Sequence, residues 1–238
     1  MVDTNFSSLS DTPKKPNGNY KDPDRHSKTL RDFHMKLWSK KLPNGELFDL
    51  TKYPQNRMRH KSDLGEFIVS SDSIGHTYRK FKEMKSIVAD IPEKEIYSFL
   101  YLCTTIGGYT IFPALMVNNQ RTINQSRGQN RYIRDRWDLT LECIRLFYLK
   151  KENPLTKTLT NYSSFFELFV HFKGYVKFFL MEDLVSKDYQ AVNCFLKHDS
   201  FELNPIPKTL GEYLTYKSNV KQFILNRNKR IKTYCKTM

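Results

Sequence analysis

The middle of the chain carries a dense group of arginines, with amide and hydroxyl side chains and Gly128 between them. A guanidinium grips phosphate or carboxylate through two parallel hydrogen bonds, and glycine lets a ligand approach the backbone closely. A helix starting just after the group would add its free first-turn amides as an anion site. We therefore predict phosphate binding within residues 121–145. The expected contacts are Asn124, Arg127, Arg131, Arg134 and Arg136, with Arg121 and Arg145 at the two ends of the group.

Three acidic residues follow at helical spacing in the same segment. Asp135, Asp138 and Glu142 stand at i, i+3 and i+7 and share one face of the helix expected there. Grouped carboxylates can hold a divalent metal or act as general acid and base, which makes these three the catalytic candidates. The alternative is a structural ion network with the neighbouring arginines. We predict no metal site and no cofactor.

The C-terminal segment is the second basic region. No acidic residue follows Glu212, while Lys and Arg recur at helical intervals beside an apolar stripe. One face of such a helix docks on the core, and the other is basic. We predict that Lys229 and Arg230 contact a phosphate backbone. A merely solvated face is the alternative reading, and an anionic membrane surface is a remote one.

A serine cluster precedes a histidine in the first third of the chain. Residues 71–73 read Ser-Asp-Ser, and His76 follows three residues later. On the first turn of a helix, Ser73 and His76 would be neighbours, but nucleophilic catalysis also needs an orienting group and an oxyanion hole. We interpret the cluster as a helix cap.

Composition limits the classes of protein. The 238 residues are 39% hydrophobic and 14% aromatic, which suffices for a core, and the net charge is +14. These values exclude a disordered acidic tail, a collagen-like repeat and a small disulfide scaffold. A positive field attracts polyanions. The alternative is that Lys-, Asn- and Tyr-rich composition reflects an A/T-rich genome.

Cysteine usage and hydropathy indicate the compartment. The four cysteines lie tens of residues apart with no C-x-x-C pair, which is typical of free thiols buried in a reducing environment. The polar N-terminus has no signal-peptide core, and no apolar run approaches the length of a membrane span. We expect a cytoplasmic protein without a membrane partner.

Periodicity and caps predict a mostly helical chain. Ser27 or Asp24 caps a helix that runs to Trp38, and Pro92 opens another helix that ends before Gly107. Further helices are expected over residues 74–88 and 187–196, and another that starts at Tyr132 or Asp135 is expected to run to Leu149. Two S/T-x-x-E patterns, at residues 164–167 and 209–212, open a long apolar helix and the basic C-terminal helix.

The expected β structure is small. Residues 67–69 form a short strand, and residues 109–113 pair with a returning strand over 121–124. Residues 1–19 are rich in turn formers and predict a flexible arm. The fold class is thus mainly α (α+β), with a single compact helical domain over residues 20–238 and a small central β-hairpin or short strands.

Several blocks of sequence together resemble a known group of proteins. They include LWSKKLPNG, SSDSI, TIGGYTIFP, TINQSRG and DRWDLTLECIR, in this order. The resemblance is to a bacterial family of about this length without an assigned function. It implies one compact, stand-alone cytoplasmic unit and supplies no activity.

Three functions follow as hypotheses. The first is binding of a phosphate-bearing partner, nucleic acid above all, through the arginine-rich segment and the C-terminal helix. The second is a nucleotide-handling enzyme with a pocket at residues 124–142. The third is a component of protein interaction or phage defence whose protein partner the sequence does not name. Whether the protein is an enzyme stays open.

Overall fold

The computed structural model describes residues 2–198, 201 and 204–237. Its main sheet is antiparallel, in the order β3 (Thr51–Tyr53), β4 (Arg57–Ser62), β5 (Gly65–Ser73) and β6 (Tyr109–Pro113). β6 is buried along its whole length, so it reads as a run of apolar and aromatic residues rather than an alternation. A two-stranded hairpin joins β1 (Lys40–Lys41) to β2 (Leu47–Phe48). Its turn ends at Gly45, where φ is +90°.

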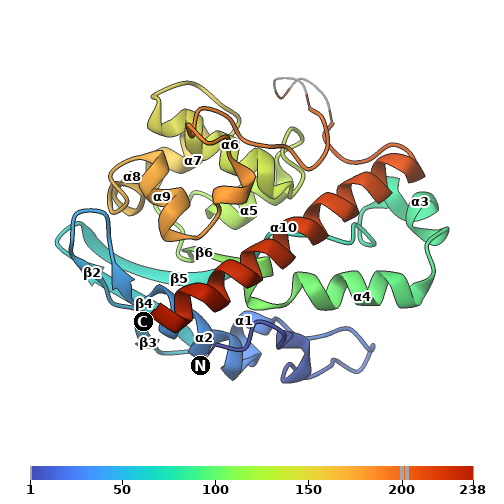
Figure 1. Ribbon diagram of the computed structural model, residues 1–238, viewed down its shortest axis with the longest axis horizontal. Coiled ribbons are helices and arrows are strands. Elements are labelled where there is room, and N and C mark those ends of the chain that lie inside the picture. Colours follow the sequence, from blue (N-terminus) through green and yellow to red (C-terminus); the bar gives the residue numbers. More distant parts are fainter. Residues whose placement is uncertain (1, 199–200, 202–203, 238) are drawn as a thin grey trace.

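Helices make up most of the regular structure, which confirms the mainly helical α+β class. In Figure 1 the long helix α10 crosses the molecule, with α5–α9 on one side and α1, α2 and α4 on the other. The helices are α1 (Pro23–His26), α2 (Lys28–Trp38), α3 (Lys85–Ala89), α4 (Glu93–Cys103), α5 (Ile123–Gln129), α6 (Trp137–Tyr148), α7 (Thr156–Asn161), α8 (Ser163–Glu167), α9 (Phe172–Phe178) and α10 (Leu210–Thr237). Short 3-10 helices are η1 (Ser8–Ser10), η2 (Lys82–Met84), η3 (Ile106–Gly108) and η4 (Glu182–Leu184).

The helix predicted from the Ser27 cap is confirmed. The Ser27 side chain accepts a hydrogen bond from the backbone N–H of Leu30, and α2 runs to Trp38. The helix after Pro92 is α4, and it ends at Cys103 as predicted. At α10 the Thr209 hydroxyl accepts from the backbone N–H of Glu212, so the expected cap is present. Local capping thus identifies these helices correctly.

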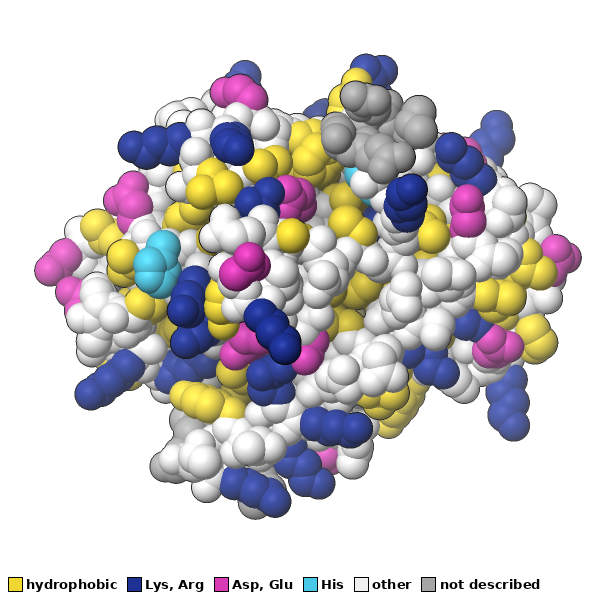
Figure 2. All heavy atoms as spheres, turned by 45° about the horizontal axis from the view of Figure 1, so that its top comes forward, with side chains coloured by type: hydrophobic (Ala, Val, Ile, Leu, Met, Phe, Trp, Pro, Cys, Tyr) yellow, Lys and Arg dark blue, Asp and Glu magenta, His cyan; other side chains and the backbone are white. Residues whose placement is uncertain are grey.

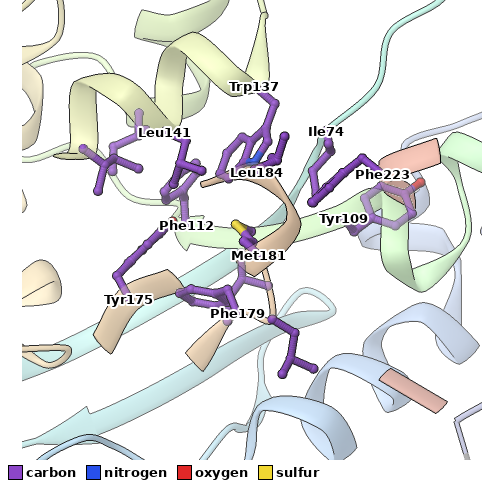
Figure 3. Packing of buried hydrophobic residues seen from close by; sticks show 14 of the residues in the cluster. Ile74, Tyr109, Phe112, Trp137, Leu141, Tyr175, Phe179, Met181, Leu184 and Phe223 are labelled. Carbon is purple, nitrogen blue, oxygen red and sulfur yellow. The ribbon is translucent and has the colours of Figure 1, made fainter. Parts of the chain in front are cut away.

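Aromatic side chains from α9 and from the segment between α8 and α9 fill one part of the core. Phe169 lies 5.2 Å from Tyr175 and 5.1 Å from Phe178, measured between ring centroids. Figure 3 shows the neighbouring part, where Phe112 of β6 meets Trp137 of α6 with their ring centroids 5.6 Å apart. The sheet and the α5–α9 helices are therefore joined by buried rings.

The N-terminal residues pack on the domain rather than forming the expected flexible arm. Val2, Ser7 and Ser8 are buried. The Ser7 and Thr104 hydroxyls are 2.7 Å apart, and the Ser8 hydroxyl lies 2.9 Å from the hydroxyl of Tyr109. Turn formers correctly predict that residues 1–19 contain no α-helix, but they reveal neither η1 nor these long-range bonds.

Four predicted elements are wrong. Residues 71–73, expected to cap a helix over 74–88, end strand β5 and pair with β6. The expected strand over residues 121–124 is instead the start of α5, where Thr122 forms a capping box with Gln125. The helix expected at 187–196 is a turn, closed by an isolated bridge between Val185 and Val192. The long helix expected after 164 is split into α8 and α9 at Val170, whose φ is +66°.

The capping box of α5 gives a stability prediction. Thr122→Ala removes the acceptor for the Gln125 backbone N–H, 3.3 Å away, and should lower the free energy of unfolding by about 1 kcal/mol. The matched control is Thr160→Ala, since this exposed hydroxyl bonds a carbonyl within α7; its expected loss is below about 0.5 kcal/mol. Urea unfolding measures both, and equal losses would contradict the capping argument.

Candidate functional site

Arg127, the centre of the predicted phosphate site, is fully buried. Its Nε donates to the Thr140 hydroxyl at 3.0 Å, and Nη1 donates to Asp72 Oδ2 at 2.9 Å. Nη2 donates to the backbone carbonyl of Asp135 at 2.7 Å. The guanidinium thus joins β5, α6 and the turn before α6. No part of it is exposed to take up a phosphate, so the prediction for Arg127 is corrected.

The turn that carries Asp135 has an unusual backbone. Arg134 and Asp135 both have positive φ, at 46° and 62°. This left-handed turn directs the Asp135 carbonyl at Arg127 and leaves the Asp135 carboxylate 3.5 Å from the same guanidinium. A Cβ on Gly128 would lie 3.1 Å from Asp135 Oδ1. Gly128 thus packs closely against the Asp135 carboxylate rather than facing an open ligand site.

Two titratable groups beside Arg127 have shifted pKa values. Burial raises the pKa of Asp72 to about 6, although Arg127 acts in the opposite direction. Burial also lowers the pKa of His76 to about 4. The His76 Nε2 atom is buried and bonds to none of the described residues. Desolvation thus dominates this cluster, as it does in a closed interior.

Arg136 and Asp138 form a second buried pair. Both side chains are fully enclosed, and the guanidinium bonds both carboxylate oxygens. Arg136 also donates to the carbonyls of Pro205 and Leu196, and Asp138 accepts from the backbone N–H of Phe195. The pair ties α6 to the chain that leads into α10. Arg136 therefore cannot contact a phosphate, and Asp138 cannot act as a base.

The remaining acids of the segment do not converge on one point. Glu142 forms a two-bond pair with Arg145 on the partly exposed side of α6, with distances of 2.7 and 2.6 Å. Asp135 faces Arg127. No group of three metal-binding side chains occurs among the described residues. The ion-network alternative therefore accounts for all three acids.

The other predicted contacts are scattered. Arg134 pairs with Glu83 at 2.7 Å, and Arg131 is exposed with its guanidinium over the Tyr132 ring. Asn124 is half-buried and donates weakly to the Ser71 carbonyl at 3.4 Å. The arginine-rich segment is thus several separate ion pairs rather than one phosphate cradle.

A serine and a histidine do meet, but not the predicted pair. His34 Nε2 lies 2.9 Å from the Ser71 hydroxyl, which also lies 2.6 Å from Asp24 Oδ1. Trp38 donates its indole N–H to His34 Nδ1, so the ring proton is on Nε2 and points at Ser71. The histidine cannot accept the serine proton in this arrangement. The chain Trp38–His34–Ser71–Asp24 is therefore a structural link from α1 and α2 to β5.

Helix α10 carries several basic residues whose surroundings differ. Within this helix, Arg227 is buried, Lys217 pairs with Glu95, and Arg230 pairs with Asp183. Lys229 is exposed as predicted. It belongs to a set of exposed lysines that make no ion pair among the described residues, here called the basic stripe: Lys221, Lys229, Lys232 and Lys236. The site prediction omitted Lys221, Lys232 and Lys236, although their helical spacing relative to Lys229 indicates that all four lie on one face.

A pocket of about 400 Å³ lies between α5 and α7. It overlaps the predicted pocket at residues 124–142 only through Ser126, Gln129 and Asn130. Its cations are Arg121 and Lys157, and the buried Asn161 Nδ2 that lines it has no partner among the described residues. Polar amides and two cations thus surround this cavity.

Mutations in the buried Arg136–Asp138 pair and in the partly exposed Glu142–Arg145 pair should lower the free energy of unfolding by different amounts. Asp138→Asn leaves Arg136 buried beside an uncharged side chain and should cost about 3–5 kcal/mol of unfolding free energy. Glu142→Gln changes the same class of residue in the partly exposed pair and should cost less than about 1 kcal/mol. Chemical denaturation measures both. If Asp138→Asn left stability unchanged, the structural role assigned to the pair would be wrong.

His34 predicts a pH-dependent stability. Burial, and then Arg227, lowers its pKa from 6.5 to about 3, so the unfolded chain binds the extra proton between these values. The stability from neutral His34 is therefore present above pH 6.5 and is lost as the pH falls towards 3. Between pH 6.5 and 5 the advantage of the wild type over His34→Gln should shrink by about 1–2 kcal/mol.

The measurement is a difference between two proteins, because Asp24 and Asp72 act with the opposite sign. Burial raises their pKa values to about 6, so their protonation favours the folded state as the pH falls. His26→Gln, at an exposed histidine on α1, is the reference. A constant difference between the wild type and His34→Gln would show that His34 is not held neutral.

Comparisons with known proteins give a family but no activity. Nothing among the curated proteins matches the chain, and no solved structure matches it. None of the described helices is long and apolar enough to cross a membrane. A family described as a family of unknown function (DUF6994) matches residues 2–231, which confirms the expected membership of an uncharacterised family. The chain belongs to this family of unknown function.

Proposed function

We propose that the protein binds a phosphate-bearing partner, nucleic acid above all, through the basic stripe of α10. The observation that supports this is a row of exposed lysines that form no ion pair with any carboxylate in the part of the chain that the structure describes. A solvated surface normally mixes both signs, as over most of the face drawn in Figure 2. The stripe instead carries one sign over the second half of a long helix.

Helix geometry brings the stripe together. At 100° per residue, Lys221, Lys229, Lys232 and Lys236 fall within an arc of about 80°, and they extend over about 22 Å of the helix axis. Duplex DNA carries one phosphate per about 1.7 Å of its axis, so it offers charges to all four lysines at once. A small anion would meet only one or two of them.

The type of residue also fits a contact without base specificity. Lysine is a flexible point charge without the planar fork that suits arginine to bidentate recognition, and three arginines, Arg127, Arg136 and Arg227, are buried in the protein. Phosphate contacts of this kind position a nucleic acid without reading its sequence. We therefore infer binding with little sequence preference.

The proposal predicts a salt-dependent affinity. For a duplex oligonucleotide measured by fluorescence anisotropy, four lysine contacts correspond to a slope of log K against log salt of about −3.6. Changing all four stripe lysines to Gln should remove that part of the slope and weaken binding at 50 mM salt. Helix α10 should still fold, because all four side chains are exposed.

The control carries the same change of net charge elsewhere. It replaces four exposed lysines outside α10 with Gln: Lys61, Lys82, Lys150 and Lys151. We expect this variant to bind nearly as the wild type does. Equal weakening of both variants would reduce the effect to net charge, and no binding by the wild type at low salt would overturn the proposal.

A second candidate function is nucleotide binding in the pocket between α5 and α7. The two cations and the Asn161 amide, whose Nδ2 has no hydrogen-bond partner among the described residues, favour it. In the same assay, ADP would displace the oligonucleotide only if the two sites overlapped. Calorimetry with ADP on wild type and Lys157→Gln tests the pocket directly, and heat of binding lost in the variant would favour this candidate.

A further inference from the structure

A pocket of about 440 Å³ lies between the end of α6 and the adjoining helices α7 and α8. Only Tyr162 separates α7 from α8, so residues four, three and four positions apart share one face of the two helices. That face lines one side of the pocket with Thr156, Thr160, Ser163 and Glu167. Lys157 and Asn161, which line the cavity between α5 and α7, lie on another face of α7. In Figure 1, α7 and α8 also lie apart from the C-terminal half of α10, so the pocket belongs to neither site proposed above.

Aromatic rings form the floor of the pocket, and the fold holds them in place. The ring centroids of Phe147 and Phe166 are 5.5 Å apart, and that of Tyr148 lies 6.2 Å from that of Phe166. The Tyr148 hydroxyl donates to the Phe166 carbonyl at 2.6 Å, which fixes the orientation of its ring. Val170, which is 57% exposed, adds an apolar edge. A preformed apolar floor in a cavity of this size is typical of sites for small organic ligands, and it suits a flat ring.

The chain that follows α6 forms the opposite wall. Lys150 has a φ of +56°, and the Lys151 backbone N–H donates to the Leu146 carbonyl at 2.9 Å. This turn ends the helix and sets Lys150, Lys151 and Glu152 beside the rings. Charged side chains thus lie next to the apolar floor.

The rim of the pocket carries both signs of charge. Its charged residues are all exposed and form no ion pair with any described residue: Lys150, Lys151, Glu152 and Glu167. The Ser163 hydroxyl likewise makes no hydrogen bond within the part of the chain that the structure describes. A ligand with a single charge would be attracted by one pair of these charged residues and repelled by the other. A ligand that carries both an amine and a carboxylate can pair with both signs.

We propose that this pocket binds an aromatic zwitterion, with the chemistry of an amino acid that carries a flat ring. The ring of the ligand lies against Phe147 and Phe166. Its ammonium pairs with the acidic residues of the rim, and its carboxylate pairs with the two lysines. The stacked ring supplies most of the affinity, because an ion pair at an exposed rim changes affinity by at most about fivefold. The site is separate from the basic stripe, so the proposal goes beyond nucleic-acid binding.

Calorimetry with three ligands that share one ring tests the charge of the ligand. L-Tryptophan carries both charges, 3-indolepropionate lacks the amine, and tryptamine lacks the carboxylate. We expect tryptophan to bind about two- to fivefold more tightly than either of the other two ligands. Equal or tighter binding of a singly charged ligand, or no heat of binding with tryptophan at millimolar concentration, would overturn the proposal.

A variant that fills the pocket tests the location. Thr160→Phe places a ring in the pocket at an exposed position and should weaken tryptophan binding at least about tenfold. The matched control is Thr215→Phe in α10, because both threonines are exposed and both hydroxyls donate to the carbonyl four residues earlier. This control should bind tryptophan as the wild type does. Equal affinities of the two variants would contradict the assignment of the pocket.

Charge variants separate recognition from a structural role. Glu152→Gln combined with Glu167→Gln should abolish the preference for tryptophan over 3-indolepropionate. Lys150→Gln combined with Lys151→Gln should abolish the preference for tryptophan over tryptamine. A merely structural effect would weaken all three ligands alike, and either this result or preferences that survive in both variants would contradict the proposal. Every variant keeps the basic stripe, so oligonucleotide binding measures the proposed function independently.

Discussion

The close crossing of α10 over η3 is the constraint on which the rest of the fold depends. A Cβ at Gly107 would collide with the Asn228 side chain, and the Gly107 N–H donates to Asn228 Oδ1 at 2.9 Å. Arg227, the preceding residue, donates to the carbonyls of Gly107, Tyr109 and Phe179. One turn of α10 therefore holds the start of β6 and the end of α9. Burial removes water from the Arg227 guanidinium and lowers its pKa to about 9. The hydrogen bonds to the three carbonyls offset this loss of solvation.

Three buried arginines and the lysines of the basic stripe have opposite surroundings. Arg127, Arg136 and Arg227 face inward, where the planar guanidinium satisfies several carbonyls and carboxylates at once. The opposite face of α10 cannot reach the core, and the lysines of the basic stripe remain in solvent. Part of the positive charge of the chain thus forms internal links through these three arginines, and another part lies in solvent on the basic stripe.

Local signals predicted the helices that carry their own caps and apolar faces. The Ser27 cap of α2, the Pro92 start of α4 and the Thr209 cap of α10 all lie within a few residues of what they specify. Ser71–Ser73 shows where such signals fail. Side chains that commonly cap helices lie here in a strand, because pairing with β6, some forty residues later, satisfies the backbone more completely.

The sequence by itself determined the fold class, the best-capped helices, the sign of the surface charge and the basic face of the last helix. Tertiary structure alone decided which arginines are buried: Arg127 meets Asp72 from 55 residues away, and Arg136 meets the carbonyl of Pro205. Spacing along the chain cannot distinguish an exposed guanidinium that is free to bind phosphate from a guanidinium that is paired with a buried carboxylate, because both arrangements use the same residue types. The difference is desolvation, which arises only when distant segments close over the charge.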